Sequence, residues 1–271
     1  MYQLRNGMIA GRGALDAAAA GGGGGEDADT TAWASAVVGG GGSVGATQRG
    51  YVDTLIKAYK AAGVWAKLDR EWLYASENIQ QAAVSIVNPG SAIHSSVAAP
   101  TFTANRGYTC SGGAYIDTNY TPGTTFTLNS LSYGAYVRSA SSGVAMGVFP
   151  VYSYFKPAGG NLEYDANEVG FFTVSNPTAA GSYIITRTAS NALAAYKNNS
   201  STALNTQTNT PSSVPVIDYY IGAANLGGSP TDAFNGEIAA VFFGGGLTGA
   251  EAAAKNTALN AYMTSVGASV Y

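Results

Sequence analysis

The sequence has little charge and only one cysteine and one histidine among its 271 residues. Charged residues make up 11% of the chain, and the formal net charge of −3 comes without a basic cluster, so the electrostatic footprint of a nucleic-acid-binding protein is missing. The single cysteine, Cys110, excludes an intrachain disulfide, and we expect it to be a small buried hydrophobic residue rather than a nucleophile. We therefore expect no nucleic acid among the partners.

Long apolar runs are missing as well. The N-terminal segment holds no apolar stretch of the length that a secretory signal needs, and no other segment is apolar for the thickness of a bilayer. We therefore expect synthesis in the cytoplasm and no membrane partner.

Residues that hold metals or cofactors are too sparse for a site. Asp117 with Asn119, or Asp218, offers too few oxygen ligands for calcium. The sole histidine, His94, has no Gly-x-Ser-x-Gly motif with which to complete a catalytic triad, and the glycine runs lack the Lys-Ser/Thr pair of a phosphate-binding loop. We expect no metal and no cofactor.

Glycine, with 36 copies, is abundant. Two runs, Gly21–Gly25 and Gly39–Gly42, enclose a short segment that contains Trp33. Consecutive glycines retain so much backbone freedom when unfolded that they usually form linkers. We therefore divide the chain into a flexible N-terminal arm with its linker, a helical lead-in unit, and a β-sandwich with a C-terminal helix, at residues 1–25, 26–90 and 91–271.

The lead-in unit has the pattern of a helical hairpin. Asp29 or Thr30 is placed to cap a first helix, which the glycines at 39–42 end. A second amphipathic helix starts at about Thr47 and stops at Gly63.

Two further signals frame the rest of the chain. Large apolar side chains crowd the segment from Trp72 to Ala75, where we expect the chain to enter a sheet. Near the C-terminus, Thr248 and Glu251 have the spacing of a capping box, and Gly267 stands where a helix usually ends. These signals predict a C-terminal helix packed on the edge of the sandwich.

From about Pro100 onward, short segments rich in Tyr, Val, Ile and Thr alternate with Gly, Pro, Asn and Ser. This rhythm is typical of an antiparallel sandwich, and the lack of crossover helices disfavours a parallel sheet. The pair Asn235-Gly236 predicts a tight turn. The predicted fold class is mainly β, an antiparallel sandwich with a small N-terminal helical unit and a C-terminal helix.

Three stretches together resemble a known group of proteins. They are GYVDTLIKAYKAAGVWAKLDREWLYASEN at 50–78, APTFTANRGYTCSGGAYIDTNYTP at 99–122, and FNGEIAAVFFGGGLTGAEAAAKNTALNAYM at 234–263. The Gly107-Tyr108 pair and the phrase from Tyr115 to Thr118 are the most distinctive parts. In this order the stretches resemble bacteriophage and prophage virion proteins over residues 29–266.

The resemblance implies a concanavalin A-like, or laminin-G-like, jelly roll closed by a short helix. It also implies a structural or adhesive role in heads or tails, and it transfers no catalytic residue. We therefore expect a non-enzymatic component of the virion surface, such as a head fibre, a capsid decoration or a tail fibre, with weak binding to a host-surface glycan. Such a chain is assembled in the host cytoplasm and attaches to other virion proteins through its N-terminal arm.

One motif supports an alternative function. Glu163, Asp165 and Glu168 have the Glu-x-Asp-x-x-Glu spacing of jelly-roll endoglycosidases, in which two carboxylates act as nucleophile and acid/base. On a regular strand Glu168 would point away from Glu163, so the chemistry requires a bulge. The competing interpretation, which we favour, is a solvated hairpin with scattered acids and a turn at Ala166 and Asn167.

Tyrosines offer a candidate ligand-binding surface. Tyr152 and Tyr154, with Tyr164 close in sequence, could present flat ring faces to a sugar. The alternative places these rings in the sandwich core or in a subunit interface.

Aromatic residues of the lead-in unit predict an oligomer. Trp33, Tyr51, Tyr59 and Trp65 carry more apolar surface than a short helical hairpin can bury by itself. The glycines at 39–42 would form a loose joint that favours contacts with other copies. By analogy with fibrous phage parts, we expect a homotrimer.

Overall fold

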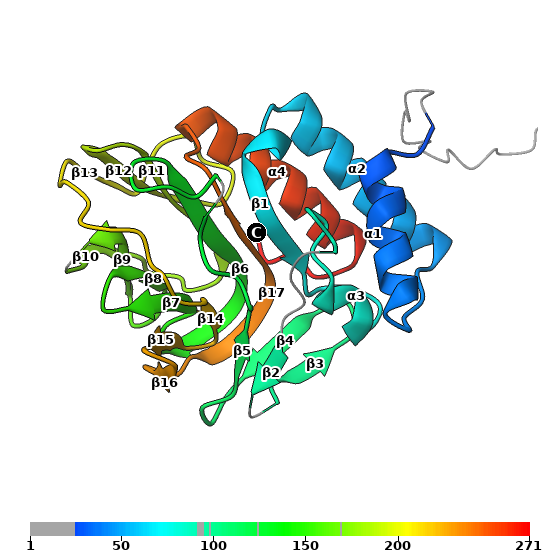
Figure 1. Cartoon of the computed structure of the whole chain (residues 1–271), viewed down its shortest axis with the longest axis horizontal. Coiled ribbons are helices and arrows are strands. Elements are labelled where there is room, and N and C mark those ends of the chain that lie inside the picture. The colour runs from blue at the N-terminus through cyan, green and yellow to red at the C-terminus, as the bar shows by residue number, and fades with distance from the viewer. Residues whose placement is uncertain (1–24, 91–94, 98, 124, 169) are drawn as a thin grey trace, which may run out of the picture.

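The computed structural model describes residues 25–90, 95–97, 99–123, 125–168 and 170–271. Two mainly antiparallel sheets lie face to face, here called sheet A and sheet B, and helices cover the outer face of sheet A (Figure 1). The predicted fold class, a mainly β jelly-roll sandwich with an N-terminal helical unit and a C-terminal helix, is confirmed. The three covering helices are α1 (Ala28–Gly39), α2 (Ala46–Ala61) and α4 (Gly249–Ser265).

Sheet A is the middle layer and is organised around β17 (Asn235–Gly244). β6 (Leu131–Ser142) pairs along one edge of β17, while β4 (Gly107–Cys110) and β1 (Leu68–Leu73) pair with the two halves of the other edge. The remaining strands are β11 (Gly181–Ala189), β12 (Ala192–Lys197) and β13 (Asn205–Gln207) beyond β6, and β3 (Thr101–Thr103) beside β4.

Sheet B forms the other layer of the sandwich, in the order β10-β9-β8-β7-β14-β5-β2. The hairpin of β15 and β16 joins it at β7, to which β15 runs parallel. The strands are β2 (Ser95–Val97), β5 (Tyr115–Asp117), β7 (Met146–Phe149), β8 (Tyr152–Lys156), β9 (Asn161–Glu168), β10 (Phe172–Ser175), β14 (Tyr220–Ile221), β15 (Ala224–Leu226) and β16 (Ser229–Thr231).

Side chains of β17 contribute to two hydrophobic cores. Val241 and Phe243 lie in the core between the sheets, whereas Phe242 packs in the core under the helices. A register shift just before Ala240 turns both Ala239 and Ala240 toward the helices. Because sheet A is covered on both faces, its central strand is a continuous apolar run rather than an alternating one.

The helix ends follow the sequence signals with one correction. The capping box at the start of α4 forms as predicted. α1 is capped by Asp27 rather than by Asp29 or Thr30, since the Asp27 side chain accepts a hydrogen bond from the N–H of Asp29 at 2.9 Å. A contact remote in sequence holds this cap, because the Asp27 N–H donates to Asp53 Oδ1 on α2 at 2.7 Å.

The glycines after α1 end the helix as predicted but do not form a loose joint. The N–H groups of Gly40 and Gly42 donate to the carbonyls of Ala36 and Val37 at 3.0 and 2.9 Å. A Cβ added to Gly42 would lie only 2.6 Å from Cβ of Gln80. Glycine is needed here because the end of α1 and helix α3 (Ile79–Ala83), which contains Gln80, pack too closely for a side chain.

Residues 26–90 are packed together with the sandwich. The chain enters sheet A at Leu68, earlier than the predicted Trp72, because β1 pairs with β17 over its whole length. A single turn, η1 (Trp65–Lys67), precedes β1, and α3 (Ile79–Ala83) follows it. Apolar residues of α1, α2 and α4 form one cluster with the outer face of sheet A. The division at residue 90 stays a prediction, but the two segments share a core.

Two of the four aromatic residues that we expected at a subunit interface lie in this core. Trp33 and Tyr59 are 1% and 0% exposed, so the prediction that these two side chains contact other copies is wrong. The physical reason is that α4 and sheet A cover the apolar surface that the helical hairpin cannot bury alone. Tyr51 and Trp65 are only partly buried, and for them the prediction remains.

Candidate functional site

Two adjoining hollows open where sheet A passes the N-terminal end of α4. The first, of about 380 Å³, lies between η1, the loop before β6 and the Gly245-Gly246 segment. The second, of about 400 Å³, lies over β11, β12 and β13. Because Thr188 and Thr248 line both hollows, we describe them together as the α4-end groove.

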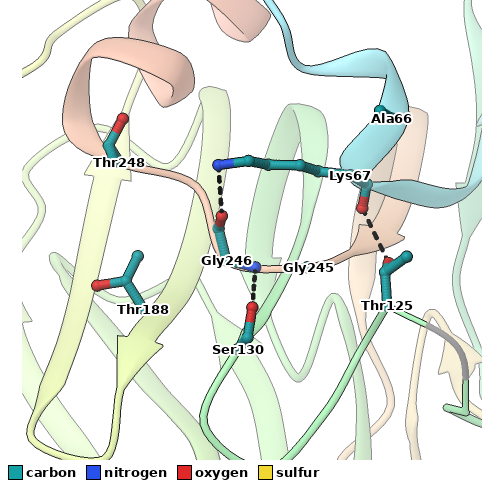
Figure 2. Close-up of a pocket in the computed structure, with 8 residues that line it drawn as sticks. All are labelled: Ala66, Lys67, Thr125, Ser130, Thr188, Gly245, Gly246 and Thr248. Carbon is teal, nitrogen blue, oxygen red and sulfur yellow. Dashed lines mark hydrogen bonds between the residues drawn. The ribbon is translucent and has the colours of Figure 1, made fainter.

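Hydrogen bonds hold the walls of the first hollow together (Figure 2). Lys67 Nζ donates to the carbonyl of Gly246 at 3.2 Å, and the N–H of Gly246 donates to Ser130 Oγ at 3.0 Å. Thr125 Oγ1 donates to the carbonyl of Lys67 at 2.9 Å. Three segments that are far apart in sequence are thereby joined around one space.

Glycine is required where the chain leaves β17 for α4. A Cβ at Gly246 would lie 2.4 Å from the carbonyl oxygen of Arg187, and a Cβ at Gly249 would lie 2.5 Å from that of Ser201. A side chain at either position would separate the strands from the start of α4. Backbone atoms therefore form this wall of the groove.

Small side chains form the floor of the second hollow. Ala192 and Ala194 alternate along β12 with Leu193, which lies in the core between the sheets, so the two alanines face outward. Tyr196, two residues further along, is half-buried and stands against Gly249 at the start of α4. An aromatic ring beside a shallow floor is suited to pack against the apolar face of a ligand ring.

The polar groups of the groove are almost all uncharged. Lys67 is the one charged side chain among the described lining residues, and it forms a salt bridge with Glu251 at 2.7 Å. Burial raises the pKa of Glu251, but hydrogen bonds from Lys67 and Thr248 outweigh this effect and leave the pKa below its ordinary value. This carboxylate is therefore ionised at neutral pH. Four lining side chains form no hydrogen bond with other described residues: Thr188, Asn191, Thr206 and Thr208.

A β-bulge places the acidic residues of β9. Glu163, Asp165 and Glu168 pair with β8 at positions 156, 154 and 152, and the pairing skips Asn167, whose φ is +65°. Since alternate residues of a strand share a face, the bulge brings the backbone of Glu168 into register with Glu163 and Asp165, although the Glu168 carboxylate contacts Arg187 of sheet A. The turn predicted at Ala166 and Asn167 is wrong, because both residues belong to β9.

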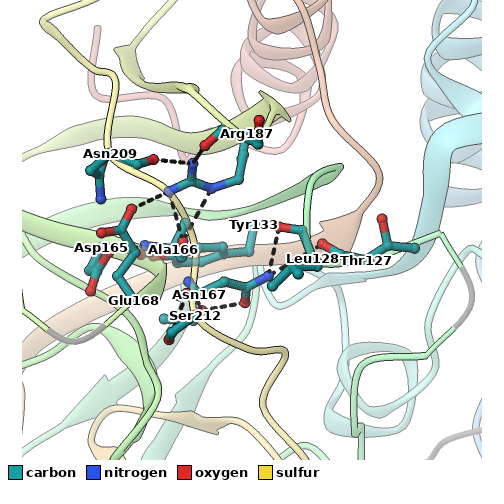
Figure 3. A network of polar contacts seen from close by, with 12 residues as sticks. Thr127, Leu128, Tyr133, Asp165, Ala166, Asn167, Glu168, Arg187, Asn209 and Ser212 are labelled. Atoms are coloured by element: carbon teal, nitrogen blue, oxygen red, sulfur yellow. Dashed lines mark hydrogen bonds and ion pairs between the residues drawn. The ribbon is translucent and has the colours of Figure 1, made fainter.

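Arg187 ties this part of β9 to sheet A (Figure 3). Its guanidinium has no exposed surface, and it donates to the carbonyl of Ala166 at 3.2 and 3.3 Å and to that of Asn209 at 2.9 Å. It also forms an ion pair with Glu168. Burial raises the pKa of Glu168, and the ion pair with Arg187 opposes this change. The Glu168 carboxylate therefore links β9 of sheet B to Arg187 of sheet A.

Asp165 is fully buried, so the interpretation of this segment as a solvated hairpin is wrong for that residue. Its Oδ1 accepts a hydrogen bond from the N–H of Ala166 at 2.6 Å, while Oδ2 accepts none from the described residues. Burial raises the pKa of Asp165 to about 8. Of the three acids, Asp165 is fully buried and Glu168 is held in an ion pair. Among them, Glu163 alone is neither fully buried nor held in an ion pair with a described residue.

The tyrosines predicted to bind a ligand are part of the protein's packing. Tyr164 lies fully buried between the sheets, and Tyr154 is 4% exposed. The ring of Tyr154 packs edge-to-face against Phe149, with centroids 5.1 Å apart. The prediction is wrong for these two residues, because the protein covers both ring faces. The side chain of Tyr152 lies outside the described part of the structure.

The other sequence candidates add no site. Cys110 is buried as predicted, and burial raises the pKa of its thiol to about 12. His94 lies outside the described residues, as does the N-terminal arm. Within the described ranges, no group of three or more His, Cys, Asp or Glu residues could hold a metal ion, and no helix has the length and apolarity to span a bilayer.

Sequence reasoning missed the α4-end groove. The alternation in NALAAYKN, which turns Ala192, Ala194 and Tyr196 to one face, was an available signal of a half-open strand. The opposite walls come from residues 66–67, 125–130 and 245–249, and no local pattern connects these segments.

No known family model matches this sequence, and no curated protein does. Solved structures do share its fold. The ligand-binding domain of botulinum neurotoxin serotype D, in complex with N-acetylneuraminic acid, matches with a TM-score of 0.51 and 14% identity over 72% of this chain and 51% of that chain.

A second solved structure is domain 4 of AbnA, an extracellular arabinanase from Geobacillus stearothermophilus, in complex with arabinotriose. It matches with a TM-score of 0.48 and 14% identity, over 70% of this chain and 98% of that chain. This chain spans about half the length of the toxin chains that it matches. At such low identity, the likeness to the toxin domain shows that this chain has the same kind of β-sandwich.

Proposed function

We propose that this chain is a non-enzymatic, adhesive component of a bacteriophage virion surface and that it binds a host-surface glycan in the α4-end groove. The observation that carries the binding is the groove itself, in which neutral hydroxyl and amide side chains surround a half-buried tyrosine ring. Sugars present hydroxyl groups and apolar ring faces, which such a lining complements.

The toxin domain supports the proposal as a precedent. That structure is in complex with N-acetylneuraminic acid, and this chain matches 51% of it, so a protein that contains a sandwich of this fold binds a sugar. Since one fold hosts many functions, the residues of this chain must carry the argument for a binding site here.

The place on a particle is supported by the resemblance of residues 50–78, 99–122 and 234–263 to phage virion proteins. A head fibre, a capsid decoration and a tail fibre all fit this resemblance. We propose that the arm at residues 1–25 attaches the chain to other virion proteins. We also propose a homotrimer that uses the partly buried Tyr51 and Trp65. Light scattering over a wide concentration range tests the trimer.

The binding test uses a matched pair of variants. Thr188→Trp places a large ring in the wall that both hollows share, whereas Thr173→Trp adds the same ring at an exposed position of β10 in sheet B. We expect wild type and Thr173→Trp to bind the same members of a glycan array and Thr188→Trp to lose them. Equal binding by Thr188→Trp would exclude the groove. Imaging of intact particles with a label on this chain tests the virion location.

A glycan-cleaving enzyme of the jelly-roll type is a second candidate, because the β9 bulge puts Glu168 in the same strand register as Glu163 and Asp165. Retaining hydrolysis needs a nucleophile and an acid/base about 5 Å apart, both able to reach the substrate. We expect no release of reducing ends from capsular polysaccharide, since Glu168 is held by Arg187. Sustained release that Glu163→Gln abolishes would establish this candidate instead.

A further inference from the structure

We propose that the α4-end groove is selective for an uncharged glycan and that it holds at least two linked sugar rings, one in each hollow. This inference rests on the proposed glycan-binding function and adds the chemical class and the minimum length of the ligand.

The charges around the groove are already paired. Lys67 Nζ contacts Glu251 at 2.7 Å and the carbonyl of Gly246 at 3.2 Å. A sugar carboxylate that approached Lys67 would have to displace Glu251 and would be repelled by it. An amino sugar would meet Lys67, the only charged residue among the described residues that line the groove, and would be repelled by it. An uncharged sugar avoids both costs.

The start of α4 offers no anion site either. Its first turn is closed by the protein's own capping box, in which the N–H of Glu251 donates to Thr248 Oγ1 at 3.3 Å and the N–H of Thr248 donates to Glu251 Oε2 at 2.8 Å. The Glu251 carboxylate therefore already occupies the position where an acidic ligand would meet the positive end of the helix dipole.

The uncharged polar groups, in contrast, are free to bind. Thr188 stands between the two hollows, while Asn191, Thr206 and Thr208 surround the second one. None of these four side chains forms a hydrogen bond with the described residues, so each can exchange a water molecule for a sugar hydroxyl.

The two hollows contribute different contacts. The first is walled by backbone and by Ser130 and Thr125, and it offers polar and apolar contacts in nearly equal shares. The second has the flat alanine floor and the Tyr196 ring, against which a sugar face can pack. Because Thr188 joins them, a ring in one hollow places the next ring of a chain in the other. A single sugar can use only half of these contacts.

The experiment measures binding of defined neutral oligosaccharides, from one ring to six, and of the same oligosaccharides ending in N-acetylneuraminic acid or a uronic acid. We expect the best neutral probe to bind at least about tenfold more tightly as a disaccharide than as a monosaccharide. We also expect its affinity to change less than about twofold between low and high salt, because no ion pair forms with the ligand.

Two matched pairs of variants tie the binding to the groove. Thr188→Val replaces the hydroxyl by a methyl group of similar size and should weaken glycan binding about three- to tenfold. Thr188→Ser keeps the hydroxyl and should keep the binding. Tyr196→Phe should keep the ring contact, and Tyr196→Ala should lose it. Circular dichroism checks that each variant is folded.

The outcomes separate this inference from the proposed function. Preference for acidic probes, steep loss of binding at high salt, or equal affinity for one ring and two would overturn the inference while leaving a glycan-binding protein. Absence of binding to every probe would overturn both.

Discussion

Lys255 of α4 and Glu71 of β1 form an ion pair at 2.9 Å in which neither side chain has any exposed surface. The same oxygen of Glu71 accepts a hydrogen bond from the hydroxyl of Tyr59 at 2.9 Å, and Lys255 Nζ lies 3.8 Å from the ring centre of Phe242. Burial lowers the pKa of Lys255, and the contact with Glu71 opposes this change. The pair joins the first strand to the last helix through the core under the helices.

Removing one partner of this pair should cost much more stability than removing both. Lys255→Met leaves Glu71 as a buried, unpaired charge, and we expect it to lower the free energy of unfolding by about 3–5 kcal/mol. The double variant Lys255→Met/Glu71→Leu should regain most of that loss, because an apolar pair needs no charge partner. Urea unfolding measures both variants. A single variant as stable as the double one would contradict the prediction.

The glycines at the end of α1 and after it should differ in their tolerance of a side chain. Gly42→Ala brings a Cβ within 2.6 Å of Gln80 and 2.8 Å of Val37, so we expect a loss of about 1–3 kcal/mol in unfolding free energy. Gly39→Ala is the control, because a Cβ there meets nothing within 4 Å. Thermal unfolding followed by tryptophan fluorescence checks both, and equal melting temperatures would show that the Gly42 contact relaxes without cost.

Acid should weaken the attachment of α1 to α2. Burial raises the pKa of Asp53, but hydrogen bonds from Lys57, from the Asp27 backbone and from Thr30 outweigh it and leave the pKa below 3.8. A carboxyl group whose pKa is lowered by folding stabilises the protein above its unfolded value and loses that contribution as pH falls below it.

We therefore expect the wild type to lose more stability than Asp53→Asn between about pH 5 and pH 3. At neutral pH the variant should be less stable by about 0.5–1 kcal/mol, as is usual for partly exposed ion pairs. Denaturant unfolding at the two pH values provides the measurement. Parallel losses in the two proteins would assign the acid sensitivity to other groups.

Asp165 should produce the opposite pH dependence. Burial raises the pKa of this carboxyl from 3.8 to about 8, so its favourable contribution is complete below pH 3.8 and is lost as pH rises through about 8. Asparagine stays neutral throughout. We expect Asp165→Asn to raise the melting temperature relative to wild type more at pH 8 than at pH 4. A constant difference at both pH values would mean that Asp165 does not titrate in this range.

The N-terminal arm should be needed for assembly and not for folding. Its residues precede a glycine run, and we expect deletion of residues 1–20 to leave a soluble protein with unchanged circular dichroism and glycan binding. The truncated chain should fail to enter particles when it is expressed during infection in place of the full chain. Normal incorporation would show that another surface makes the attachment.

The sequence by itself determined the local structure and the fold class. The capping box before α4, the stripe of α2 and the strand rhythm after Pro100 are signals that depend only on residues a few positions apart, and all three appear in the structure. Such signals survive because hydrogen bonds within a turn of helix, and the alternation of a strand, need no distant partner.

Only the tertiary structure determined which strands pair, which polar side chains are buried and where the α4-end groove lies. Asn235-Gly236 predicts a turn, yet both residues lie inside β17, because Asn235 pairs with Ser142 and Gly236 with Ala140 on β6. Asp165 is buried because sheet packing covers it, and the α4-end groove combines segments from four parts of the chain. Pairing and burial depend on residues remote in sequence, and their free energies outweigh local turn propensity.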